Sequence, residues 1–235
     1  MLSVIKANVG KVGKAVLKQK LKKEYDAQSY IPNERAIEYR FVFQSIHKTS
    51  PKTVLDIGTG LTALPHLMSS CGLIVTAIDN IYEYWSKGGM FNRHFHLISD
   101  DITTSKLKGQ WDLITCISTL EHIKNYEAAV KHMFALLKPK GHLVLTFPYN
   151  EREYVANAYT LPGAAVNKNI SYICQVYSRE QLEVWLTQNG GRIIDQEYWK
   201  CYEGDFWTLG TKIHPPLQVK KEEKHQLSCI LIQKD

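Results

Sequence analysis

Short, nearly continuous apolar segments alternate with helical patterns along most of this chain. The segments 53–57 (TVLDI), 73–79 (LIVTAID), 111–118 (WDLITCIS) and 142–148 (HLVLTFP) are typical of strands that are buried on both faces of a sheet. Residues 94–98 (HFHLI) alternate and indicate a shorter strand. Because helices are predicted between these strands, we expect a parallel sheet covered on both sides, which is a doubly wound α/β fold.

The predicted helices have recognisable ends. Residues 36–47 show helical spacing and stop before Pro51. Another helix begins after Asn125, a good N-cap residue, and Pro139 with Gly141 should terminate it. The remaining elements are a helix that reaches about residue 70, a helix over 178–189, and strands over 192–199 and 227–233.

The length of 235 residues fits one domain with a sizeable core. We expect a basic N-terminal arm and lid segment over 1–32, followed by a single domain over 33–235. The stretches 148–177 and 200–226 show no strong periodicity. Stretches of that length in a compact domain are usually functional lids or contain short elements of their own, so both are candidate ligand-binding loops.

The net charge of +6 belongs to the N-terminal arm. The first 23 residues contain seven lysines and no acid, and without them the 29 basic residues fall to 22, against 23 acidic ones. Four apolar residues of the arm form a helical stripe that two glycines weaken: Ile5, Val9, Val12 and Val16, with Gly10 and Gly13. The arm is either a solvated extension or a weak contact for an anionic surface, and the first is favoured because runs of charge are usually solvated.

Composition excludes several broad classes. With 44% hydrophobic and 22% charged residues, the chain is typical of a folded globular protein. No apolar run approaches the roughly 20 residues that cross a bilayer, and the arm lacks the apolar core and cleavage site of a secretory signal. The five cysteines are odd in number and form no C-x-x-C pair, which indicates a reducing, cytoplasmic compartment.

The turn after the first predicted strand has features of a nucleotide site. Gly58 and Gly60 allow a positive φ and let the backbone approach a ligand at the start of a helix. The third glycine of a dinucleotide-binding turn is absent, and Asp56 precedes the turn, where a carboxylate would repel a pyrophosphate but orient a positively charged ligand. Asp79 ends the second strand, where a carboxylate can bind the hydroxyls of a ribose.

The series VLDIGTG, TAIDN, DDI, WDLITCISTLEHI and LLKPKGHLVLTFPY resembles the class I S-adenosylmethionine-dependent methyltransferases in order and spacing. The resemblance covers most of residues 33–233 and is closest to the group that modifies small molecules and glycans. It implies a Rossmann-like, seven-stranded, mostly parallel sheet with an antiparallel last strand, and S-adenosylmethionine as cofactor. The cofactor-binding residues that it implies are Asp56, Gly58, Thr59, Gly60, Asp79, Asn80, Asp101, Ile102 and Ser118.

The same resemblance implies a role for each acid. Asp56 would hold the ammonium of the ligand, and Asp79 the ribose hydroxyls. Asp101 with Ile102 would recognise the adenine, and Ser118 would lie near the sulfonium. Each Asp taken singly is better explained as a turn or N-cap residue, but three acids at successive strand ends favour cofactor binding.

Methyl transfer from a sulfonium depends mainly on holding two reactants in line and excluding water. A base is needed only if the acceptor is a hydroxyl or a protonated amine. Glu121 and His122, directly after the fourth strand, are the candidate catalytic residues, because a histidine titrates near neutrality. The alternative that both residues simply begin the next helix stays open. No metal is expected.

Aromatic residues gather in the two unpatterned stretches. Tyr149, Tyr154 and Trp207 are candidates for a wall around an acceptor ring, and Arg35 could help to close the site. Half of these aromatics could instead belong to the core. The expected activity is methylation of an oxygen or nitrogen of a small molecule or sugar. The alternatives are a non-catalytic cofactor-binding scaffold and a nucleic-acid methyltransferase, which the nearly neutral body and the missing [DNS]-P-P-[YF] stretch disfavour.

Overall fold

The computed structural model describes residues 13–16, 18–20, 22, 23, 26, 33–60, 62–80, 95–165, 170 and 172–235. The chain divides into two units, Met1–Asn33 and Glu34–Asp235. In the first unit the described residues before Asn33 are helical, and Lys22 and Asp26 form an exposed ion pair at 2.6 Å. Val16 of the predicted apolar stripe is 61% exposed, and Ile5, Val9 and Val12 lie outside the described residues.

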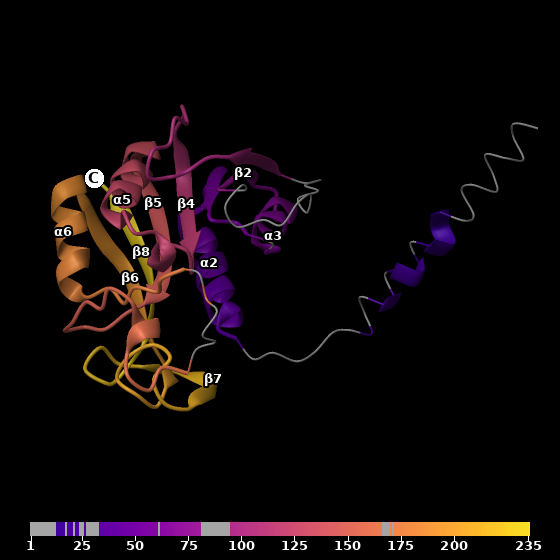
Figure 1. The fold of residues 1–235 in the computed structure, drawn as a ribbon. Helices are drawn as coiled ribbons and strands as arrows, with labels where there is room; N and C mark the ends of the chain where they lie inside the picture. The colour runs from indigo at the N-terminus through magenta and orange to yellow at the C-terminus, as the bar shows by residue number, and fades with distance from the viewer. Residues whose placement is uncertain are drawn as a thin grey trace, which may run out of the picture. The chain divides into compact units, whose positions relative to one another are not determined.

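The second unit is built on one eight-stranded sheet (Figure 1). Its strands are β1 (Thr53–Ile57), β2 (Ile74–Asp79), β3 (His96–Ser99), β4 (Trp111–Ile117), β5 (Leu137–Pro148), β6 (Gly191–Tyr202), β7 (Lys212–Val219) and β8 (Leu227–Lys234). They lie in the order β3-β2-β1-β4-β5-β8-β6-β7. The first five pair in parallel, whereas β8 runs antiparallel between β5 and β6, and β7 pairs antiparallel with β6. The mostly parallel sheet expected from the sequence is confirmed, with one strand more than the predicted seven.

The additional strand β7 lies at an edge of the sheet, within a stretch that the sequence left without a pattern. Its sequence contains Pro215 and Pro216, and proline cannot donate a backbone hydrogen bond to a neighbouring strand. Strands that contain proline are therefore tolerated at sheet edges, and this one could not be recognised from strand propensity.

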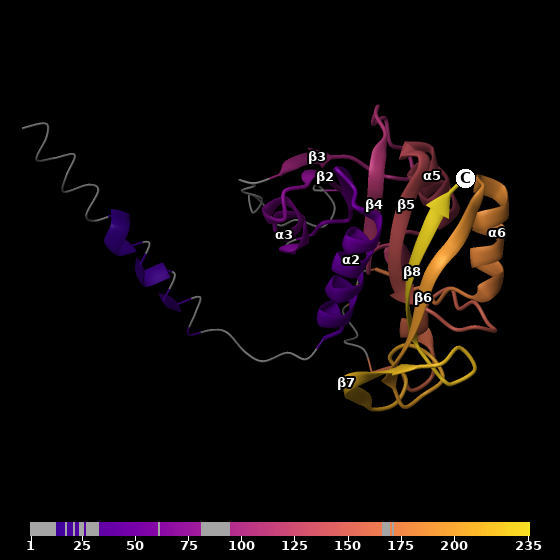
Figure 2. The ribbon, with the colours of Figure 1, turned by 180° about the vertical axis from the view of Figure 1, so that it is seen from behind.

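Helices cover both faces of the sheet (Figure 2). They are α2 (Arg35–Thr49) and α3 (Leu64–Ser70) on one face, and α5 (Tyr126–Leu136) and α6 (Arg179–Asn189) on the other, with short 3-10 helices η1 (Leu120–His122) and η2 (Ala158–Thr160) between strands. No helix in the described ranges is long and apolar enough to cross a membrane.

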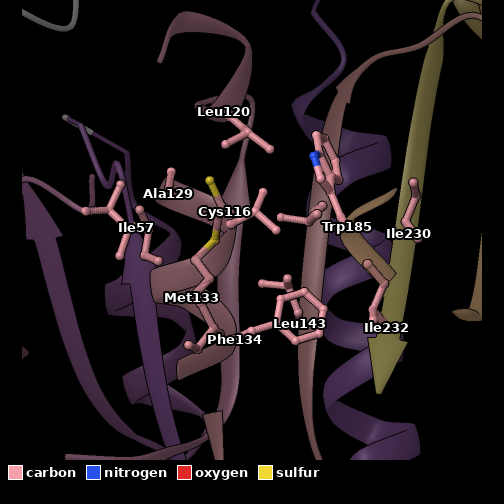
Figure 3. Close-up of a cluster of buried hydrophobic side chains, with 14 of the residues drawn as sticks. Ile57, Cys116, Leu120, Ala129, Met133, Phe134, Leu143, Trp185, Ile230 and Ile232 are labelled. Carbon is pink, nitrogen blue, oxygen red and sulfur yellow. The ribbon is translucent and has the colours of Figure 1, made fainter. Parts of the chain in front are cut away.

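The core lies in two layers because alternate residues of each strand point to opposite faces. Leu55 and Ile57 of β1 pack in one cluster with Met133 of α5, while Val54 packs in the other with Phe41 of α2. Figure 3 shows the first cluster, in which side chains from α5 and α6 meet those of the central strands. The helices are thus fixed on the sheet by apolar burial, and the polar groups at the strand ends remain for other contacts.

Two helix ends show how local signals act. Asn125 caps α5 through its side-chain oxygen, which accepts a hydrogen bond from the Ala128 amide. The helix ends at Leu136, before Pro139 and Gly141, because Leu137 already pairs with β4 at Trp111. Strand β5 therefore begins five residues earlier than the sequence indicated, and both predicted helix breakers lie inside it.

Candidate active site

A cavity of about 510 Å³ lies at the carboxyl ends of the central parallel strands. The strand order reverses between β1 and β4, and in open α/β sheets ligands bind beyond the strands at such a switch point. Its volume is within the range of small-molecule sites. The lining residues are Ile57, Gly58, Ile78, Asp79, Asn80, Asp100, Asp101, Ile102, Thr103, Thr119, His122, Ile123, Lys124, Asn125, Tyr172 and Ile173.

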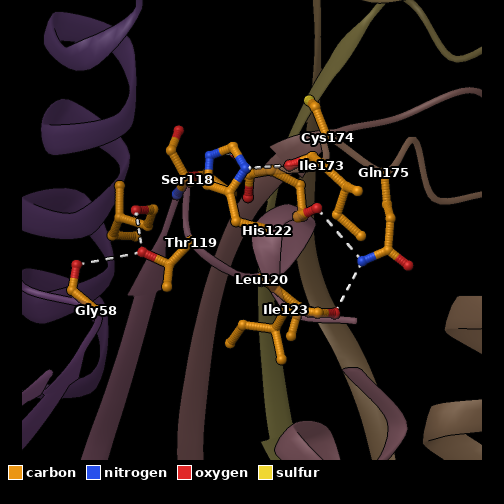
Figure 4. A network of polar contacts seen from close by, with 12 residues as sticks. Gly58, Ser118, Thr119, Leu120, His122, Ile123, Ile173, Cys174 and Gln175 are labelled. Carbon is orange, nitrogen blue, oxygen red and sulfur yellow. Dashed lines mark hydrogen bonds and ion pairs between the residues drawn. The ribbon is translucent and has the colours of Figure 1, made fainter. Parts of the chain in front are cut away.

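The glycine turn after β1 is held tightly against the end of β4. Gly58 has φ +71°, and a Cβ atom there would lie 2.1 Å from Cγ2 of Thr119. The Thr119 hydroxyl donates a hydrogen bond to the Gly58 carbonyl at 3.2 Å (Figure 4). Gly60 has φ +51°, and among the described residues a Cβ atom there would have no neighbour nearer than 4.0 Å. Gly58 is thus required by its close contact with Thr119, whereas the reason for glycine at position 60 is its backbone conformation.

Four further residues with predicted roles in binding the cofactor line the same cavity. Asp79 is anchored because its Oδ2 accepts the backbone N–H of Gly60 at 2.7 Å, and its carboxylate keeps lone pairs for a ligand. Asp101 and Ile102 follow β3, and Asp101 Oδ1 accepts the Thr103 amide and hydroxyl at 2.8 Å. Asn80 lines the cavity beside Asp79.

Asp56, Thr59 and Ser118, which the sequence also predicted to bind the cofactor, do not line the cavity. Asp56 and Thr59 are buried, and Asp56 accepts a hydrogen bond from the Thr115 hydroxyl at 2.6 Å. Burial raises the pKa of Asp56 to about 7, although that hydrogen bond acts in the opposite direction. Ser118 follows β4 with φ +43°, a conformation that is rare for a residue with a Cβ atom.

His122 reaches the cavity from η1. Its Nδ1 lies 2.6 Å from the Ile173 carbonyl, which can only accept, so Nδ1 carries the hydrogen and Nε2 offers a lone pair (Figure 4). The ring also meets Tyr172 edge to face, with 4.6 Å between centroids. Burial lowers the pKa of His122, which favours the neutral imidazole.

The neighbouring Glu121 is a buried carboxyl group that lies outside the cavity lining. It is 4% exposed, and among the described residues its Oε2 has no hydrogen-bond partner. Burial raises the pKa of Glu121 to about 8. Its Oε1 lies 3.8 Å from Nε2 of His122. Burial therefore opposes charge on both groups of this contact.

The structure does not bring the four predicted acceptor-binding residues to the cavity. Tyr149 is fully buried, and its hydroxyl donates to Glu151 at 2.8 Å. The Tyr154 hydroxyl donates a hydrogen bond to the side chain of Gln175 at 2.7 Å. Trp207 packs edge to face on Tyr202, with 5.1 Å between ring centroids. Arg35 pairs with Glu38 at 2.7 Å. The aromatic residues serve the core instead: Tyr149 and Trp207 belong to the two buried clusters, and Tyr154 packs against the cluster of Tyr149.

Two buried polar residues at this edge escaped the sequence prediction. Gln175 ties its segment to η1 by donating to the carbonyls of Glu121 and Ile123 at 3.3 and 2.9 Å (Figure 4). Glu38 is fully buried on α2. A signal for Glu38 was present, because it is three residues from Phe41 and four from Val42 and so lies on the apolar face of the helix. Gln175 has no comparable local signal.

Sequence comparison identifies relatives of this chain. A family model described as a methyltransferase domain matches residues 32–196. A ubiquinone biosynthesis O-methyltransferase of Coxiella burnetii is 28% identical over 155 residues, which cover 61% of this chain and 65% of that protein. The mitochondrial ubiquinone biosynthesis O-methyltransferase of Schizosaccharomyces pombe is 30% identical over 112 residues, which cover 45% of this chain and 41% of that protein. The chain thus spans less than two thirds of the length of these curated relatives.

Comparison with solved structures supports the fold. An S-adenosylmethionine-dependent methyltransferase from Clostridium acetobutylicum gives a TM-score of 0.53 at 15% identity, covering 93% of this chain and 99% of that one. The N-methyltransferase NodS from Bradyrhizobium japonicum, in complex with S-adenosyl-L-homocysteine, gives a TM-score of 0.51 at 15% identity. The match covers 86% of this chain and 87% of that one. Since the family model matches more than half of the sequence, the chain belongs to the methyltransferase-domain family, which confirms the resemblance of its motifs.

Proposed function

We propose that this protein transfers a methyl group from S-adenosylmethionine to an oxygen or nitrogen of a small molecule or sugar. One observation carries the proposal: Gly58, Asp79, Asn80, Asp101 and Ile102 converge on one cavity at the switch point of the sheet. Family membership and the O-methyltransferase relatives point to the same class of reaction. The convergence makes a cofactor site a better explanation than isolated turn residues.

The residues at the cavity fit this cofactor. Gly58 lines the cavity, so the backbone of the glycine turn can approach the methionine part. The Asp79 carboxylate is already oriented by Gly60 and can accept both ribose hydroxyls. Ile102 offers an apolar surface for the adenine, with Asn80 and Asp101 beside it. When bound, S-adenosylmethionine supplies an electrophilic methyl group on a positively charged sulfur.

The protein's main contribution is to position the acceptor and exclude water. His122, Tyr172 and Ile173 line the cavity on the side of η1 and are the best candidates for contact with the acceptor. They replace Tyr149, Tyr154 and Trp207 in this role, because those three do not line the cavity. The wall that meets the acceptor is thus smaller than the aromatic content of the loops indicated.

His122 is the proposed general base for a hydroxyl acceptor. Its Nδ1–H is bound to Ile173, so the proton from the acceptor would go to Nε2. Burial lowers its pKa and keeps the ring neutral, which is the form a base requires. Glu121, with its raised pKa, is proposed to stay protonated beside the ring and so not to compete for that proton. The relatives named as O-methyltransferases favour an oxygen acceptor.

A cytoplasmic location is part of the proposal. The five cysteines are all free, which agrees with a reducing compartment. The role of residues 1–23 stays as expected from sequence: a solvated extension, with weak contact to anionic surfaces as the alternative.

Calorimetry with S-adenosylmethionine and with S-adenosylhomocysteine tests the cofactor assignment on the full chain. We expect heat and a thermal shift with both ligands. Methyl transfer is then measured with a panel of hydroxylated rings, amines and sugars. No heat and no thermal shift with either ligand at millimolar concentration would refute the proposed function.

A further inference from the structure

The short helix η1 depends on contacts from outside its own turn, because a helix of three residues leaves carbonyl groups without partners. Within the turn, the amides of His122 and Ile123 donate to the carbonyls of Thr119 and Leu120, both at 3.0 Å. The carbonyls of Glu121 and Ile123, one on each side of His122, accept hydrogen bonds from a distant segment instead.

Gln175 provides these hydrogen bonds (Figure 4). Its backbone N–H donates to the Glu121 carbonyl at 2.9 Å, and its side-chain Nε2 donates to the Ile123 carbonyl at 2.9 Å. Its Oε1 accepts the Tyr154 hydroxyl at 2.7 Å, so both ends of the amide have the kind of partner that they require. Gln175 is buried, and loss of its side-chain amide would leave a carbonyl of η1 unsatisfied.

The segment that contains Gln175 is itself fixed beside the end of β5. Val176 exchanges two backbone hydrogen bonds with Val155, both at 2.9 Å. The amide of Tyr177 donates to the Pro148 carbonyl at 3.0 Å. The segment is therefore a firm support from which Gln175 can hold η1.

The same segment also fixes the ring of His122. The carbonyl of Ile173 lies 2.6 Å from Nδ1, and Tyr172 meets the ring edge to face. His122 lines the cavity, whereas Gln175 does not. A turn of η1 would move the ring away from Ile173, so the direction of Nε2 depends on how the peptide groups around His122 are held.

We propose that Gln175 is a positioning residue that fixes the peptide groups on both sides of His122, so that the ring stays bonded to Ile173 and presents Nε2 to the methyl acceptor. The role in the reaction rests on the proposed function, in which His122 is the base. Glutamine suits this place because a glutamate carboxylate has no hydrogen to donate to the Ile123 carbonyl.

Gln175→Met tests the proposal on the full chain, because methionine is similar in length and has no donor. We expect kcat for methyl transfer to fall by roughly 10–100-fold, as a small misplacement of a reacting group implies. The affinity for S-adenosylmethionine, measured by calorimetry, should stay within about twofold, because Asp79 and Asp101 lie at other strand ends and keep their contacts.

The tautomer of His122 is a readout that a merely structural role would not change. Nitrogen NMR at pH 9, where the ring is neutral, distinguishes Nδ1–H from Nε2–H, and the spectrum of His122→Ala identifies the signal. We expect the Nδ1–H form alone in the wild type. Gln175→Met should show both forms, because the hydrogen bond that selects the tautomer is loosened. A variant that keeps the Nδ1–H form alone would overturn the positioning role.

A double variant shows whether Gln175 acts through His122. In the His122→Ala background, Gln175→Met should lower kcat no further, because the two residues act as a unit. A further loss as large as that in the wild-type background would contradict the proposal. Wild-type turnover in His122→Ala would refute the base in the proposed function, and the NMR measurement would still decide whether Gln175 positions the ring.

Gln226→Met is the matched control. Gln226 is also a buried glutamine that joins backbone segments, since its Oε1 accepts the amides of Cys201 and Tyr202 at 2.9 and 3.0 Å. Its Nε2 donates to the Gly204 carbonyl at 2.6 Å, and Gln226 does not line the cavity. This variant should lose stability and keep both kcat and the tautomer of His122.

If Gln175→Met fails to fold, Tyr154→Phe takes its place. That variant removes only the hydroxyl that Gln175 Oε1 accepts and keeps the aromatic ring. We expect a smaller loss of kcat, about 2–5-fold, together with a minor Nε2–H signal from His122. Wild-type kcat with the Nδ1–H form alone would overturn the inference.

Discussion

Acidic residues at the two ends of the central strands have pKa values shifted in opposite directions. At the amino end, Asp112 accepts hydrogen bonds from the backbone amides of Lys52 at 3.0 Å and Thr53 at 2.9 Å. It also accepts hydrogen bonds from the Thr53 hydroxyl at 2.9 Å and from the Lys138 ammonium group at 2.6 Å. Burial opposes ionisation there, but the contacts with Lys138 and Thr53 outweigh it and hold the pKa of Asp112 well below its usual range. At the carboxyl end, burial raises the pKa of Asp56 to about 7 and that of Glu121 to about 8.

This difference separates stability from function within one sheet. A carboxylate whose charge is fully paired with a cation and with hydrogen-bond donors favours the folded state. A buried carboxyl group without such partners lowers the stability of the folded state when it ionises. Groups with pKa values shifted in this way are typical of functional sites. The amino end therefore behaves as a structural edge, and the carboxyl end keeps hydrogen-bonding capacity for a ligand.

The largest effect is expected at His122. His122→Ala should lower turnover by ~10²–10⁴ with a hydroxyl acceptor, because the proposed base is lost. In the wild type the rate should fall as pH drops below the lowered pKa of His122, under its ordinary value of 6.5, and the variant should lack this acid limb. The measurement is a pH profile of turnover. A small, pH-independent loss would show that His122 only positions the acceptor.

Glu121→Gln sharpens the comparison through stability. The folded pKa of Glu121 is raised from 4.5 to about 8, so the pH-dependent part of the cost of burying it is absent below pH 4.5 and grows up to about pH 8. Relative to the variant, the free energy of unfolding of the wild type should therefore fall by about 2–4 kcal/mol across that window. Denaturant unfolding at pH 5 and pH 9 measures it. A gap that stays constant with pH would mean that Glu121 is ionised in the folded protein.

Asp79→Ala probes the ligand side of the carboxyl edge. Loss of the carboxylate that binds the Gly60 N–H, and that is proposed to bind the ribose, should weaken binding of the methyl donor by about 1–3 kcal/mol, or roughly 5–150-fold. Calorimetry measures the affinity. Asp205→Ala, which removes an exposed acid paired with Lys224, is a suitable control and should bind normally. Equal affinities of the two variants would place the ribose elsewhere.

Asp112→Asn should have the smallest effect, and its effect on stability should depend on pH in the opposite direction to that of Glu121→Gln. The variant should lose about 1–2 kcal/mol of stability at pH 7, because the Lys138 contact loses its charge. The pKa of Asp112 is lowered from 3.8, so the deficit should be complete above that pH and shrink as pH falls below it. Affinity for the methyl donor should not change. A loss of donor affinity comparable to the loss of stability would break the distinction between the two edges.

Much of the scaffold could be predicted because its signals are local. The segment 53–57 was predicted as a strand and is β1 without any shift, since its apolar run and the glycine turn mark both ends. Helix α6 begins after the N-cap Ser178, which forms a capping box with Gln181, and ends at Asn189 with Gly190 as its C-cap. Strand β7 was missed because its prolines contradict strand propensity, and only its place at the edge of the sheet permits them.

The sequence by itself determined that the residues proposed to bind the cofactor lie together at one edge of the sheet. Gly58 and Asp101 follow strands that the apolar pattern identifies, and Asp79 ends another. The carboxyl ends of parallel strands lie at one edge of the sheet. Local order along the chain was therefore enough to predict that these residues meet.

Only the tertiary structure decided which polar and aromatic residues serve the site and which serve the core. Glu38 bonds to Ser118 and Thr146, which are 80 and 108 residues away, and Gln175 holds η1 across 52 residues. Tyr149 has the residue type of a binding wall but is fully buried and contacts Phe147 and His225. Such roles depend on which distant segments pack together, and residue type and spacing do not encode that packing.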